Sequence, residues 1–88
     1  IVECYPNPFN GKLNIRYHIN NTSNILATIY DLSGKVIKSF KYEQKYPGQH
    51  QLIWDTKNNN GDAVATGLYF VSLSSENRTI NTKVLYLK

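Results

Sequence analysis

The segment LNIRYHI, residues 13–19, alternates apolar and polar side chains without a break. Successive side chains of a β-strand point to opposite faces, so Leu13, Ile15 and Tyr17 share one face. A period of two is typical of a strand that buries one face and leaves the other in water. The alternation therefore favours a β fold, and no segment longer than a turn has the 3.6-residue period of a helix.

Further segments with the same pattern follow along the chain, separated by Gly, Pro, Asn and Asp residues. We expect additional strands over residues 25–30, 35–42, 50–54, 68–73 and 79–87, with turns at 20–23, 31–34, 46–48, 55–62 and 76–78. Gly34 can supply the positive φ of a tight hairpin turn. About seven short strands predict an all-β, immunoglobulin-like antiparallel β-sandwich. A closed five-stranded barrel of the oligonucleotide-binding type fits the same spacing, and periodicity does not separate the two.

The same alternation predicts which side chains fill the core. The apolar parity of each segment contains aliphatic residues and large aromatic rings, including Trp54. The predicted core is Leu13, Ile15, Tyr17, Ile25, Ile29, Leu52, Trp54, Tyr69, Val71 and Val84.

Length and composition limit the function classes. A chain of 88 residues is long enough for one domain, residues 1–88, and leaves little room for a deep substrate cavity. The net charge of +4 arises from scattered Lys and Arg residues, which argues against a nucleic-acid partner. No apolar run approaches the ~18 residues of a membrane span, so we expect no direct membrane insertion. The sequence contains no Met, and we expect it to be a fragment of a longer secreted protein.

Residues with catalytic or metal-binding chemistry are few and do not cluster in the sequence. Cys4 and His50 can be imagined as a nucleophile and base, but a strand histidine and a small buried thiol are the favoured interpretation. We therefore predict no catalytic, cofactor-binding or metal site. The groups considered are Cys4, His18, His50, Glu3, Asp31, Glu43, Asp55, Asp62 and Glu76.

The Asn-rich segment 55–62 has the oxygen ligands of a calcium loop, because Asp55, Asn58, Asn60 and Asp62 lie close together in the sequence. The spacing matches an EF-hand loop poorly, since Gly67 stands where the bidentate Glu belongs. A solvated turn held by Asn and Asp side chains is the favoured interpretation.

The most distinctive string is YPNPFN, residues 5–10, in which two prolines favour an extended, rigid approach to the strand at 13–19. It is followed in order by IYDLSGK at 29–35, Trp54-Asp55, Asn60-Gly61, VATGLY at 64–69 and KVLYLK at 83–88. Taken together, these pieces resemble the type A C-terminal sorting domain of the bacterial type IX, or Por, secretion system. They also resemble the related immunoglobulin-like domain of the flagellar hook-capping protein.

This resemblance implies a non-catalytic signal that directs an upstream cargo across the outer membrane, with the mature protein secreted or held at the cell surface via the periplasm. The implied partners are the type IX translocon, a sortase-like protease and the cargo domain of the same precursor. The terminal strand is expected to offer unpaired backbone groups and a row of side chains. An immunoglobulin-like accessory or spacer module remains the alternative. The residues expected to be recognised are Gly67, Leu68, Tyr69, Lys83, Val84, Leu85, Tyr86, Leu87 and Lys88.

Overall fold

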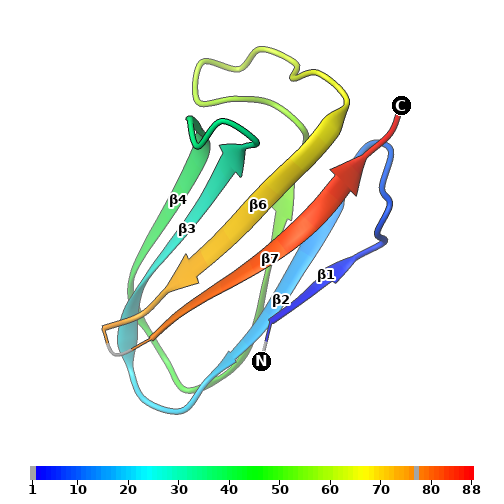
Figure 1. Ribbon diagram of the computed structural model, residues 1–88. Helices are drawn as coiled ribbons and strands as arrows, with labels where there is room; N and C mark the ends of the chain where they lie inside the picture. The colour runs from blue at the N-terminus through cyan, green and yellow to red at the C-terminus, as the bar shows by residue number, and fades with distance from the viewer. Residues whose placement is uncertain (1, 77) are drawn as a thin grey trace.

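Seven β-strands form two antiparallel sheets in the computed structural model, which describes residues 2–76 and 78–88. Figure 1 shows the two sheets stacked face to face. The strands are β1 (Val2–Tyr5), β2 (Leu13–Ile19), β3 (Ser23–Asp31), β4 (Val36–Lys45), β5 (Gly48–Trp54), β6 (Gly67–Ser74) and β7 (Thr79–Tyr86).

The first sheet has the strand order β1-β2-β5 and the second has the order β4-β3-β6-β7. β1, β2 and β5 thus face β3, β6 and β7, which is the immunoglobulin-like arrangement. β4 joins the second sheet as an edge strand. This confirms the predicted β-sandwich and rules out a closed five-stranded barrel. Within the described residues no helix is long and apolar enough to cross a membrane.

The strand boundaries differ from the expected ones at several places. β1 was not expected, because four residues that precede a proline carry too short a pattern to identify a strand. The residues that follow β1 are bent rather than extended, and both bonds, Tyr5-Pro6 and Asn7-Pro8, are cis. This bend carries Phe9 into the core. β4 runs on to Lys45, and the turn expected at residues 76–78 includes Asn77, which lies outside the described residues.

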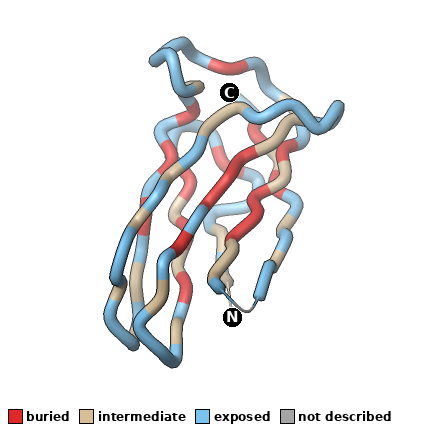
Figure 2. Tube along the Cα trace, turned by 90° about the vertical axis from the view of Figure 1, so that its left-hand side faces the viewer, coloured by how far each residue is buried: buried red, intermediate tan, exposed pale blue. Residues whose placement is uncertain are grey.

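All ten predicted core residues are buried between the sheets. Figure 2 shows that most buried positions lie along the strands, where they alternate with intermediate and exposed positions. Five buried apolar residues were missing from the predicted list. They are Phe9, Ala27, Val64, Leu73 and Tyr86.

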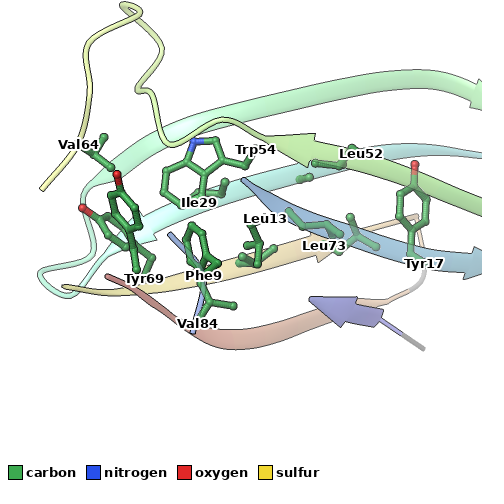
Figure 3. Close-up of a cluster of buried hydrophobic side chains, with 14 of the residues drawn as sticks. Phe9, Leu13, Tyr17, Ile29, Leu52, Trp54, Val64, Tyr69, Leu73 and Val84 are labelled. Atoms are coloured by element: carbon green, nitrogen blue, oxygen red, sulfur yellow. The ribbon is translucent and has the colours of Figure 1, made fainter. Parts of the chain in front are cut away.

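Trp54 is fully buried at the end of β5 and joins the two sheets (Figure 3). Its ring lies 5.4 Å from the ring of Tyr69 and 5.8 Å from that of Phe9, measured between centroids. The indole Nε1 donates a hydrogen bond of 2.9 Å to the carbonyl of Lys57, so its polar atom is satisfied. Burial of this large ring makes Trp54 the main anchor of the core.

Candidate functional site

The two segments expected to be recognised lie side by side, because β7 pairs with β6 along its whole length. Gly67 is opposite Tyr86, and Leu68 is opposite Leu85. Gly67 has a φ of 148°, a conformation that favours glycine, where β6 begins. The structure therefore brings residues 67–69 and 83–86 together at one end of the four-stranded sheet.

Three residues of this group are buried and face the core. Tyr69, Val84 and Tyr86 are 5%, 1% and 4% exposed. Burial raises the pKa of Tyr69, and the negative charge of nearby Asp31 raises it further. These side chains hold the strand pair against the core and do not reach a partner in the folded domain.

The remaining side chains of the group are accessible. Leu68 is 36% exposed and Leu87 is 48% exposed. Lys83 and Lys88 are exposed, and Leu85 is half-buried. A partner of the folded domain therefore meets a basic and aliphatic set of side chains.

Asn7 and Phe9 close the outer edge of β7 near its end, where Figure 1 shows the loop after β1 beside the end of the chain. The Leu85 amide donates to Asn7 Oδ1 at 3.0 Å, and Asn7 Nδ2 donates to the Lys83 carbonyl at 3.3 Å. The Phe9 amide donates to the Leu85 carbonyl at 3.0 Å, and the Leu87 amide donates to the Phe9 carbonyl at 2.9 Å.

The expectation of unpaired backbone groups is therefore wrong for this end of β7. The physical reason is that a bare strand edge invites pairing with other chains, and here the domain uses its own loop to cover it. Sequence reasoning singled out YPNPFN but did not connect it to the terminal strand, since nothing in the string indicates its distant partner.

Phe9 fixes this loop through its ring. The side chain is 2% exposed and stacks on Tyr86, with ring centroids 5.1 Å apart and planes inclined by 19°. A surface depression of about 370 Å³ remains beside it. Its lining residues are Pro6, Pro8, Phe9, Asn10, Leu87 and Lys88.

Cys4 and His50 are not brought together as a catalytic pair. They lie on opposite sides of β2, where Cys4 is opposite Ile15 and His50 is opposite Tyr17. Cys4 is half-buried, and burial raises the pKa of its thiol to about 11, which disfavours the reactive thiolate. His50 Nε2 lies 2.6 Å from the carbonyl oxygen of Tyr46.

The Asn-rich loop is held by its own hydrogen bonds. Asn58 Oδ1 accepts bonds from the backbone amides of Asn60, at 2.9 Å, and Asp62, at 3.0 Å. The favoured interpretation, a turn held by Asn and Asp side chains, is confirmed. Among the described residues no group of three His, Cys, Asp or Glu side chains is placed to hold a metal ion.

The family model of the secretion system C-terminal sorting domain matches residues 3–87 of the chain. The chain belongs to this family. It is a non-catalytic sorting domain of the Por, or type IX, secretion system, part of a secreted or surface protein and recognised by that system's machinery.

Solved structures share the fold of this sorting domain. PorZ, a surface component of the type IX secretion system of Porphyromonas gingivalis, superposes over 99% of the chain with a TM-score of 0.67 and 17% identity. Dimeric latent PorU from the same organism superposes over 98% with a TM-score of 0.73 and 20% identity. The matched region is 11% of the PorZ chain and 9% of the PorU chain.

The flagellar resemblance is also found. The basal-body rod modification protein FlgD of Salmonella typhimurium is 30% identical over 53 residues, which is 60% of the sorting domain and 23% of FlgD. FlgD of Pseudomonas aeruginosa superposes over 84% of the domain and 59% of its own chain, with a TM-score of 0.63 and 22% identity. The sorting domain thus spans less than a quarter of the curated relative that it matches.

Proposed function

We propose that residues 1–88 fold as one domain at the end of a longer precursor, and that the translocon reads this domain as a folded object. The precursor reaches the periplasm by Sec export, the outer-membrane translocon recognises the tail, and a sortase-like protease removes it from the cargo. Family membership supports the role in sorting. The route and the protease follow from the resemblance described above.

The recognition element in this proposal is the end of β7 with the adjoining residues 67–69. The observation that carries it is the closed outer edge of β7, where Asn7 and Phe9 occupy the backbone groups of Leu85. Because the edge is closed, recognition relies on side chains rather than on an added strand. Val84 and Tyr86 fix the strand from within, and Leu87 and Lys88 extend beyond it.

A reporter fusion tests this function. Residues 1–88 are fused to the C-terminus of a periplasmic reporter in a host that has the type IX apparatus. We expect the reporter at the cell surface or in the medium. The change Leu87→Ser with Lys88→Ser should retain the reporter in the periplasm, because it removes an apolar and a basic side chain beside the recognition element. Both residues lie outside the core, so the domain should still fold.

Removal of residues 83–88 should also retain the reporter, but this deletion takes Val84 and Tyr86 from the core. The double substitution is therefore the cleaner variant, and Asn60→Ala in the exposed loop is its control. If the intact fusion stays in the periplasm while a known sorting tail exports the same reporter, the domain is an accessory module instead.

A further inference from the structure

The outer face of the four-stranded sheet carries an apolar patch that the core does not use. Val36, Tyr30 and Phe70 lie in register across β4, β3 and β6. Leu68 and Leu85 form the next pair along β6 and β7. We call these five residues the outer patch. Val36 is 46% exposed and Leu68 is 36% exposed, while the other three are half-buried.

The outer face of the three-stranded sheet is built differently. Arg16 Nε donates to Glu3 Oε1 at 3.0 Å, and Gln51 Nε2 donates to Asn14 Oδ1 at 2.9 Å. These bonds link neighbouring strands through their own side chains. No side-chain hydrogen bond joins members of the outer patch within the described part of the chain.

The row of Val36, Tyr30 and Phe70 continues to a basic residue, because Lys83 lies opposite Phe70 on β7. Lys41 lies opposite Leu26, two rows away, where Glu43 and Glu76 line the same surface depression. The outward positions in register with Leu26, Thr28 and Tyr30 hold no carboxylate. The carboxylate of Asp31, at the adjoining turn, accepts hydrogen bonds from its own turn residues Ser33 and Lys35.

We propose that the outer patch is a docking surface for a component of the secretion machinery whose contact surface has an apolar centre flanked by carboxylates. This inference rests on the proposed sorting function and is continuous with its recognition element, since Leu68 and Leu85 belong to both. An apolar centre with aromatic residues and a polar rim is typical of protein interfaces, and charged groups across such an interface are complementary in sign. Clusters of about four to eight Lys or Arg residues are typical of segments that bind anionic membrane surfaces. Among the described strand positions paired on this face, the basic residues are Lys41 and Lys83.

Export of the reporter fusion tests the inference with variants of the outer patch. Because Leu68 also belongs to the recognition element, the single variant Val36→Asp distinguishes the two. Val36→Asp lies on β4, across the sheet from β7. We expect Val36→Asp combined with Leu68→Asp to lower the exported reporter about tenfold, because a charge is placed in the apolar centre. The matched control is Ile53→Asp, which is 50% exposed on the outer face of the three-stranded sheet and should stay within about twofold of the unchanged domain.

A second pair of variants tests the charge of the partner. Val36→Lys changes the same position with the opposite sign, so an acidic partner surface tolerates it better than Val36→Asp. The emission of buried Trp54 in each purified variant verifies folding. If the double variant does not fold, the comparison of Val36→Asp with Val36→Lys tests the docking surface instead. The Val36 side chain is half exposed on an edge strand, so both single variants should fold.

Equal export by Val36→Asp and the unchanged domain overturns the docking surface and leaves the sorting function intact. An unchanged domain that is not exported overturns both. Greater loss with Val36→Lys than with Val36→Asp overturns the acidic partner. Binding of the chain to phosphatidylglycerol vesicles that is lost in the double variant assigns the patch to a membrane and overturns the protein partner.

Discussion

The two sheets fill a common core with the same alternation, but their outer faces differ. On the three-stranded sheet, Glu3, Arg16, Asn14 and Gln51 satisfy one another across neighbouring strands. On the four-stranded sheet, the outer patch offers apolar side chains beside lysines. The inward positions are constrained by packing, whereas outward positions need only remain soluble. The proposed docking surface rests on this difference between the outward sets.

Both outer edges of the four-stranded sheet are partly covered by loops. An asparagine from a loop covers part of each outer edge: Asn7 bonds the backbone of β7, and Asn59 bonds that of β4. Ser39 donates its amide to Asn59 Oδ1 at 3.1 Å, and the Asn59 amide donates to the Ile37 carbonyl at 3.0 Å. With both edges partly covered, the face of the sheet becomes the more accessible route to a partner.

The largest effect is expected from Trp54→Ala, which tests whether the two sheets depend on one core. Loss of this fully buried ring should lower the free energy of unfolding by about 3–5 kcal/mol through the cavity that it leaves. Urea unfolding measures the loss, and amide exchange should show β2 and β6 opening together. A loss below about 1 kcal/mol, or separate transitions for the two sheets, would contradict a shared anchor.

A smaller effect is expected from the two edge caps. Asn7→Ala removes two side-chain bonds to β7 and should cost about 1–2 kcal/mol, whereas Asn59→Ala removes one side-chain bond and should cost about 0.5–1 kcal/mol. Amide exchange should accelerate at Leu85 in the first variant and at Ser39 in the second. Asn60→Ala, in the same exposed loop as Asn59, is the control. Equal losses in all three variants would show that the edge bonds contribute nothing specific.

The smallest effect is expected from Asp31→Asn and concerns the carboxylate nearest the outer patch. Hydrogen bonds from Ser33 and Lys35 lower the pKa of Asp31 below its ordinary value. A lowered folded-state pKa stabilises the fold above the unfolded-state value of about 3.9, and this contribution is lost as the pH falls through the folded-state pKa. Unfolding between pH 7 and pH 2 should show the variant less stable at neutral pH, with the difference shrinking below about pH 4. A pH-independent difference would instead indicate that Asp31 is not engaged by its own turn.

Much of the fold follows from local pattern. The alternation of residues 13–19 and the later segments predicted the β-sandwich, the ten core residues and Gly34 at a tight turn, where its φ is 89°. Such predictions succeed because side-chain parity and turn chemistry are properties of neighbouring residues. The ordered motifs likewise indicated the sorting-domain family, because they can be identified without the pairing of the strands.

Local pattern in the sequence therefore predicted six of the seven strands, the inward faces of those strands and the family. The cover that Asn7 and Phe9 form over the end of β7 depends on the folded structure, because 78 positions separate Asn7 from Leu85. The tertiary structure also places Val36, Tyr30 and Phe70 in one row on an outer face. The physical reason is that period and turn signals act over a few residues, while strand order and register are fixed by how the whole chain buries its apolar surface.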